Sequence, residues 1–265
     1  MATDSPQRSY RAPCPGCGAP VEFRSAQSIH AVCAYCHSTV LRSGDSLSRI
    51  GKMAELFDDF SPLQLLASGV WQVDGKSLAF TLVGRLQYKY AEGSWTEWHA
   101  VFADGGSAYL SEDNGAFVMA LPLATTTPLP DAAQYPVGSP VNFDGRAFSV
   151  ASNQQVVLLA AVGELPHLPP TGQAFAMVEL RSGGDAGPGT DDTVLSIDYG
   201  TQPPTLSVGR SVRLEDLQLT GLRDESSKEE VGRQFACPQC GAPVEAKLAS
   251  SKSIKIGRAS CRERV

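Results

Sequence analysis

Four cysteines near the amino terminus constrain the fold of this 265-residue chain more than any other feature. They form two Cys-x-x-Cys pairs, Cys14 with Cys17 and Cys33 with Cys36, and 15 residues separate the pairs. This is the spacing of a four-thiolate zinc site, in which each pair lies on one tight turn and directs both sulfurs at the same ion. We therefore predict a zinc ribbon over residues 12–44, after a disordered segment over residues 1–11, with zinc as the cofactor.

Two other uses of paired cysteines fit the sequence less well. Disulfides form in oxidising compartments, and the polar opening stretch from Met1 to Tyr10 lacks the apolar segment of an export signal. A thioredoxin-like redox site needs only one pair within a βαβ pattern, which is not visible here. His30 and His37 lie close to the cysteines in sequence, but four sulfurs already complete a tetrahedral site. We expect these two histidines to be packing or surface residues.

The first cysteine pair recurs near the carboxyl end of the chain. The motif Cys14-Pro-x-Cys17-Gly-Ala-Pro-Val-Glu returns as Cys237-Pro-x-Cys240-Gly-Ala-Pro-Val-Glu, which predicts the first half of a second zinc ribbon over residues 234–255. Residues 256–265 resemble the translation of a sequencing-library adapter, so we expect a scar there and a natural protein that continues beyond Lys255. The closing pair of the second ribbon would fall in that tail. Cys237 and Cys240 are therefore predicted to form an incomplete metal site.

The segment after the first ribbon has a weak helical periodicity. Apolar residues recur at i, i+3, i+4 and i+7 as Ile50, Met53, Ala54 and Phe57. We expect a linker helix over residues 45–60, which ends before Ser61-Pro62.

A long region of short alternating runs follows. Asp74-Gly75, Asp104-Gly105 and Asp144-Gly145 separate these runs, and an Asp-Gly pair between alternating segments is a strong signal for a β-hairpin turn. Residues 61–223 are therefore expected to form an antiparallel β sandwich or partly open barrel, followed by a polar linker over residues 224–233. The fold class predicted for the chain is mainly β.

Charge is unevenly distributed and bears on the class of partner. Residues 1–44 have a net charge of +2, whereas residues 61–224 carry eight basic and 17 acidic residues, a net charge of −9. Nucleic-acid affinity comes largely from neutralising phosphates, so the β region should repel nucleic acid and only the ribbon can make weak contact with it. The acidic region instead favours cationic partners, although a solvated acidic surface explains the same composition. No apolar run is long enough to span a membrane, and we expect a soluble, cytoplasmic protein.

The most distinctive polar and aromatic cluster of the β region is Trp95-Thr96-Glu97-Trp98-His99. On a strand, Trp95, Glu97 and His99 share one face and Trp98 points to the other. Three interpretations remain: acid-base catalysis by Glu97 and His99, a binding surface formed by Trp95, Glu97, Trp98 and His99, or a structural aromatic face. No phosphate loop, nucleophile motif or open histidine-carboxylate metal site accompanies the cluster. We expect no catalytic residue and no enzyme activity.

The order of the motifs resembles the bacterial domain-of-unknown-function 4178 family. After the ribbon come Ser61-Pro-Leu-Gln-Leu65, Gly84-Arg-x-Gln-x-x-Tyr-x-x-Gly-x-Trp-x-Glu-Trp98 and Phe102-x-Asp-Gly105, and the resemblance is clearest over residues 14–115. It implies a bacterial origin, a β-rich fold and a longer protein with a second ribbon and β domain. The family has no established activity to transfer. Its frequent association with polyamine aminopropyltransferase-like genes implies an enzyme of that kind as a partner.

These observations together predict a zinc-binding, non-enzymatic binding or scaffold protein with an unidentified protein partner. The alternatives are an accessory protein that binds polyamine-like cations or an aminopropyltransferase-like enzyme, and weak nucleic-acid contact through the ribbon.

Overall fold

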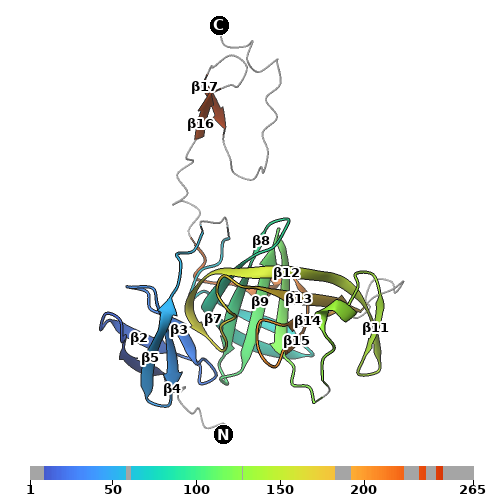
Figure 1. The fold of residues 1–265 in the computed structure, drawn as a ribbon, viewed down its shortest axis with the longest axis horizontal. Coiled ribbons are helices and arrows are strands. Elements are labelled where there is room, and N and C mark those ends of the chain that lie inside the picture. Colours follow the sequence, from blue (N-terminus) through green and yellow to red (C-terminus); the bar gives the residue numbers. More distant parts are fainter. Residues whose placement is uncertain are drawn as a thin grey trace. The chain divides into compact units, whose positions relative to one another are not determined.

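The computed structural model describes residues 9–57, 61–126, 128–182, 192–223, 233–236 and 243–246, and nearly all regular structure in them is β-strand (Figure 1). The described residues contain no α-helix, and their two helical turns are the 3₁₀ helices η1 (Ala132–Gln134) and η2 (Leu214–Leu217). None of these helices has the length and apolar character needed to cross a membrane. The predicted mainly β class is confirmed.

The amino-terminal ribbon is built from five short strands: β1 (Tyr10–Pro13), β2 (Pro20–Phe23), β3 (His30–Val32), β4 (Ser38–Ser43) and β5 (Ser46–Lys52). Strands β1 and β2 form one antiparallel hairpin, and β3, β4 and β5 form an antiparallel meander. A small core holds the hairpin and the meander together. It consists of Val21, Phe23, Ala31 and Val40 packed with Cys14 and Cys33.

The prediction of a linker helix over residues 45–60 is wrong, because residues 46–52 form strand β5 and residues 53–57 have no regular structure. Gly44 adopts a φ of 60° and turns the chain so that Ser43 pairs with Ser46. The periodic apolar residues do not share a buried stripe, since Met53 is buried but Ile50 is 51% exposed and Phe57 is 62% exposed. Short helices are marginal without packing, and pairing with β4 satisfies the backbone instead. Residues 58–60 lie outside the described residues.

The β domain contains ten strands. They are β6 (Ser68–Val73), β7 (Lys76–Lys89), β8 (Ser94–Phe102), β9 (Ser107–Asp113), β10 (Ala116–Pro122), β11 (Pro140–Phe143), β12 (Arg146–Leu165), β13 (Ala174–Arg181), β14 (Thr193–Asp198) and β15 (Thr205–Val212). Antiparallel pairing runs in the order β12-β13-β14-β15-β10-β9-β8-β7, and β7 pairs again with β12. The sheet thus returns to the strand from which it started.

Strand β12 closes the sheet because it is long enough to pair with two neighbours in turn (Figure 1). Its residues 149–157 pair with β13, and its residues 158–163 pair with β7. The two pairings use different parts of β12. This one strand therefore joins the two ends of the barrel sheet. Of the two architectures predicted, the structure is therefore the partly open barrel and not the sandwich.

The contact between β7 and β12 depends on two glycines that lie opposite each other, Gly84 and Gly163. A Cβ atom on Gly84 would overlap the carbonyl oxygen of Glu164, and one on Gly163 would overlap the carbonyl oxygen of Val83. Gly163 also has a φ of 75°, which side chains other than glycine rarely allow. Only glycine lets the two backbones approach closely enough to pair.

Replacing Gly84 by alanine is expected to lower the free energy of unfolding by about 1–3 kcal/mol, the usual cost of forcing a methyl group into filled space. Gly51→Ala in β5 is the matched control, because a Cβ there meets no atom within 4 Å. Urea denaturation of both variants measures the difference. Equal stability of Gly84→Ala and Gly51→Ala would contradict the close approach.

The barrel strands have one apolar face and one mixed face, which carries polar side chains and a third apolar cluster around Leu86, Val156 and Phe175. The apolar face carries two clusters: one includes Trp98 and Leu110 and is covered by Leu63 and η2, and the other includes Leu180 and is covered by Tyr135. Because side chains alternate along a strand, the residues between these point the other way, into the barrel. This inward face lines the two cavities of the barrel.

The second unit of the chain spans residues 223–265, and its described part is one antiparallel hairpin, β16 (Arg233–Ala236) with β17 (Pro243–Ala246). Arg233 pairs with Ala246, which repeats the pairing of Tyr10 with Phe23 in the first ribbon. The repeated sequence therefore forms the same hairpin in the same register. Cys237 and Cys240, the adapter-like tail and all of the predicted linker over residues 224–233 except Arg233 lie outside the described residues.

Candidate functional site

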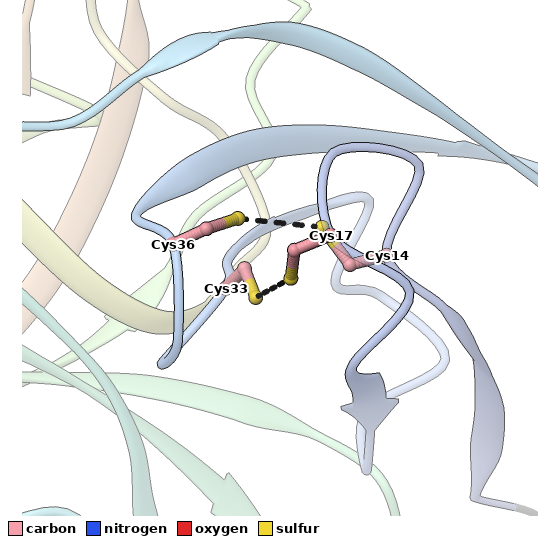
Figure 2. Close-up of side chains that lie close together, drawn as sticks. All are labelled: Cys14, Cys17, Cys33 and Cys36. Carbon is pink, nitrogen blue, oxygen red and sulfur yellow. Dashed lines mark hydrogen bonds between the residues drawn. The ribbon is translucent and has the colours of Figure 1, made fainter.

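Four sulfur atoms meet between two tight turns of the ribbon (Figure 2). The Sγ atoms of Cys14, Cys17, Cys33 and Cys36 all lie within 4.8 Å of one another. Cys14 Sγ is 3.8 Å from Cys36 Sγ, and Cys17 Sγ is 3.7 Å from Cys33 Sγ. Four sulfurs at tetrahedral corners about 2.3 Å from a zinc ion are about 3.8 Å apart. The spacing therefore fits one tetrahedral ion, whereas a disulfide would need sulfurs about 2 Å apart.

The two turns that carry the cysteines have the same backbone geometry. In each, the carbonyl of the first cysteine accepts the N–H of the residue after the second: Gly18 donates to Cys14 at 2.8 Å, and His37 donates to Cys33 at 2.9 Å. Both donor residues adopt positive φ, 78° at Gly18 and 57° at His37. The two halves of the site thus approach the ion as similar knuckles, although only the first has the glycine that eases this conformation.

The surroundings of Cys36 favour the thiolate form that a metal requires, whereas at Cys17 a backbone hydrogen bond at Ala19 lowers the pKa but hydrogen bonding to the neighbouring thiols and burial raise it above its usual value. The hydroxyl of Ser38 lies 3.2 Å from Cys36 Sγ, and hydrogen bonding from Ser38 lowers the pKa of the Cys36 thiol to about 6. The backbone N–H of Gly16 donates to Cys14 Sγ at 3.3 Å. Donors directed at sulfur stabilise its negative charge, as is typical of metal-binding cysteines.

Neither nearby histidine joins the four sulfurs. Among the described residues, the four cysteines are the one group of three or more histidine, cysteine or acidic residues close enough to share an ion. His37 Nε2 lies 4.0 Å from Glu55, at the surface. His30 is the first residue of strand β3, and burial lowers the pKa of its ring. Both positions agree with the packing or surface roles predicted for them.

The ribbon is joined to the barrel through Glu164 at the end of β12. Its carboxylate is buried and accepts the backbone N–H of Arg24 at 2.8 Å and that of Ser25 at 2.9 Å. On the barrel side, His99 Nδ1 lies 3.1 Å from the backbone carbonyl of Glu164. Strand β3 pairs with the same stretch, Ala31 opposite Glu164. The sequence contains no signal for this contact, because a single glutamate looks like any surface residue until its partners are in place.

The Trp95–His99 cluster is divided between the two faces of β8. Trp98 is buried in the apolar face, where its Nε1 donates to Glu112 at 3.3 Å. His99 is also buried, and burial lowers its pKa to about 4, so its ring is neutral. Its Nδ1–H then donates to the Glu164 carbonyl while Nε2 accepts the Ser107 hydroxyl at 2.9 Å. Trp98 and His99 are core residues and do not contribute to the exposed binding surface suggested for them.

Trp95 and Glu97 line the interior of the barrel, where two adjoining cavities have volumes of about 330 and 290 Å³. Residues of both cavities come from strands β8, β9, β10, β13, β14 and β15. The side chains common to both cavities are Glu97, Tyr109, Met177, Ser196 and Ser207. The two cavities therefore adjoin at these side chains, in an interior space lined by both apolar and polar residues.

Three ionisable groups meet at one end of this space. His167 Nε2, in the segment after β12, lies 3.6 Å from Asp198 Oδ2 at the end of β14. Burial lowers the pKa of His167, but hydrogen bonding to Asp198 and its charge outweigh this effect and raise the pKa above its usual value. Burial raises the pKa of Glu97 to about 7, although the charge of His167 opposes the shift. The ring of Tyr109 packs edge-on against His167 at 5.9 Å.

Sequence reasoning identified Glu97 but missed Tyr109, His167 and Asp198. These residues are far apart in the chain, and closure of the barrel brings them together. The one signal available was alternation, which places Tyr109 and Asp198 opposite apolar neighbours on β9 and β14. That signal does not show which strands become neighbours.

A four-cysteine ribbon docked on an antiparallel barrel defines the class of this protein. A comparison with protein families matches residues 71–214 to the domain of unknown function DUF4178. The match covers more than half of the chain, which therefore belongs to this family, as the motifs predicted. It begins in β6 and ends at η2, so it covers the barrel and not the ribbon. No curated protein and no solved structure matches the chain.

Proposed function

We propose that this chain is a zinc-binding, non-enzymatic scaffold or binding protein in which the zinc ion has a structural role. The supporting observation is the group of four sulfurs at the edge lengths of a zinc tetrahedron. Structural zinc sites are closed by four protein ligands, whereas catalytic sites keep one position for water or substrate. Four thiolates leave no such position.

The ribbon has little else to hold it together. Its own core has six buried side chains, and two of them are the ligands Cys14 and Cys33. Structural zinc supplies about 10–16 kcal/mol of binding free energy to small domains of this kind. The ordered ribbon then places the amides of Arg24 and Ser25 against Glu164, so the metal also stabilises one end of the barrel.

Exposed apolar side chains support a protein partner at the ribbon. Of the large apolar residues exposed in the described part of the chain, Ile29, Tyr35, Ile50 and Phe57 all lie before the barrel. Tyr35 stands between the cysteines of the second knuckle and is 70% exposed. A ribbon made rigid by zinc presents these side chains in a fixed arrangement.

The purified chain is expected to hold one zinc ion, measured by elemental analysis against protein concentration. Cys33→Ser and Cys14→Ser should each reduce the zinc content to well below one ion per chain, because three thiolates and a hydroxyl bind zinc far more weakly. The double variant Cys237→Ser with Cys240→Ser is the control and should keep its zinc. Two tightly bound ions per chain, or zinc retained after both ribbon substitutions together, would contradict the proposal.

A further inference from the structure

The interior of this barrel combines a buried apolar cluster, which includes Leu86, Val156 and Phe175, with polar side chains around two cavities. A barrel of about eight strands is just wide enough to be filled by side chains or to hold one small ligand. Here the inward positions carry Glu97 on β8, Tyr109 on β9, Asp198 on β14 and Ser207 on β15, and they leave about 330 and 290 Å³ in the two connected cavities. A cavity of this size that is lined by apolar and aromatic side chains with a few polar groups is typical of a ligand site.

Negative charge predominates in the cavity. Each of its two cations already has an anionic partner: Arg181 Nε lies 2.7 Å from Glu179 Oε1, and His167 Nε2 lies 3.6 Å from Asp198 Oδ2. The carboxylate of Glu97 has no hydrogen bond or ion pair of this kind to any described residue. Glu97 is half-buried, and a carboxylate removed from water without a partner is costly unless it is protonated or meets a cation.

A second polar group beside Glu97 also lacks a partner. The hydroxyl of Tyr88 is completely buried and forms no hydrogen bond to the described residues. Burial raises the pKa of Tyr88 well above its usual value, and the charges of Glu97 and Asp198 raise it further. Its ring stacks on Trp95, a cavity-lining residue, with centroids 4.9 Å apart.

The ionisable side chains of the cavity do not form a compact group of three or more metal ligands. Among the described residues, the cysteine site alone brings three or more metal-ligating groups close enough for that, and Glu97, His167 and Asp198 do not. A cation that satisfies them must be larger, with its charge near the acids and its carbon atoms against the rings that line the rest of the cavity. Aromatic faces also attract organic ammonium groups.

We propose that the barrel cavity is a binding site for a small organic ammonium compound. Its charged nitrogen lies at Glu97 and Asp198, and its carbon skeleton extends past Tyr109 toward Trp95. This site is separate from the zinc ribbon and goes beyond the structural function proposed for it.

The test compares ammonium probes with neutral molecules of the same skeleton on the intact, zinc-loaded chain. Phenethylamine and n-hexylamine, titrated by calorimetry or NMR at pH 8, are each compared with 2-phenylethanol and 1-hexanol. At least one amine is expected to bind about tenfold or more tightly than the matching alcohol, because a single charge-assisted contact contributes about that much affinity. Equal affinity for amine and alcohol, or no binding of either amine at millimolar concentration, would overturn the proposal.

Glu97→Gln keeps the shape of the side chain and is expected to weaken amine binding about tenfold. Glu215→Gln is the matched control, because Glu215 is exposed and pairs with Arg213 away from the cavity. Zinc content and melting temperature, measured in the same samples, show that the variant is folded and keep this test independent of the metal site. Unchanged amine affinity in Glu97→Gln would refute the assignment.

The affinity for an amine is also expected to rise about tenfold from pH 6 to pH 8. Glu97, whose pKa is raised to about 7, changes from mostly protonated to mostly ionised over this range, while the amine stays charged. The groups facing Glu97 whose pKa values are shifted act in the same direction or not at all: the raised pKa of His167 means that its ring can only lose charge as the pH rises, and the raised pKa values of Tyr88 and Tyr109 keep both hydroxyls neutral. Glu97→Gln should remove most of this dependence. An affinity that is flat or falls with pH would contradict the role of Glu97.

Discussion

Removal of the metal is expected to unfold the ribbon, strands β1 to β5, while the barrel strands stay folded. The ribbon has only a small apolar core of its own, so it depends on about 10–16 kcal/mol from a structural zinc ion. The barrel has two separate apolar clusters, one around Trp98 and one around Leu180, that do not include the metal. The two parts should therefore respond differently to a chelator.

Hydrogen exchange followed by mass spectrometry measures this difference peptide by peptide. With chelator, amides of β3 and β4 should lose protection, and those of β8 and β9 should keep it. Cys33→Ser should show the same pattern without chelator. Tyr35→Ser is the control within the same knuckle, since Tyr35 is exposed and offers no ligand, and it should exchange like the wild type. Protection of β3 and β4 that survives chelation would show that the ribbon folds without metal.

The second large effect is expected from Glu164→Ala, which should lower the free energy of unfolding by about 2–4 kcal/mol. The substitution leaves the buried amides of Arg24 and Ser25 without an acceptor, and each unsatisfied buried group costs about 1–3 kcal/mol. It also removes the side chain that joins the ribbon to β12. Urea denaturation at pH 7 measures the loss.

Glu22→Ala is the matched control for Glu164→Ala. Glu22 pairs with the side chain of the same Arg24 at 3.2 Å, but both side chains are well exposed. Exposed pairs contribute about 0–1 kcal/mol, so this variant should be nearly as stable as the wild type. Similar losses for the two variants would mean that Glu164 is not the link between ribbon and barrel.

The features that could be predicted from the sequence are those fixed by neighbouring residues. The spacing of the cysteines determines that each pair lies on one turn, and the four sulfurs do meet. The Asp-Gly pairs predicted hairpins, and both residues adopt positive φ at Asp74-Gly75 and Asp144-Gly145, as a two-residue type I′ turn requires. Alternation along the strands gave the mainly β class.

The features that could not be predicted depend on contacts between distant residues. The segment after the ribbon carried a helical pattern, yet pairing with β4 makes it a strand. Glu97 and His99 looked equivalent on one face of a strand, but Ser107 and the Glu164 carbonyl enclose His99, whereas Glu97 opens into the cavity. The residues that line the cavity with Glu97 come from β9, β14 and the segment after β12, and only the closed barrel brings them together.

The most direct test of the metal site is zinc X-ray absorption spectroscopy of the purified, intact chain. Four thiolates from Cys14, Cys17, Cys33 and Cys36 predict a single shell of four sulfur atoms at about 2.3 Å, with no nitrogen or oxygen neighbour. A shell with fewer sulfurs and added nitrogen or oxygen atoms would contradict the four-cysteine centre.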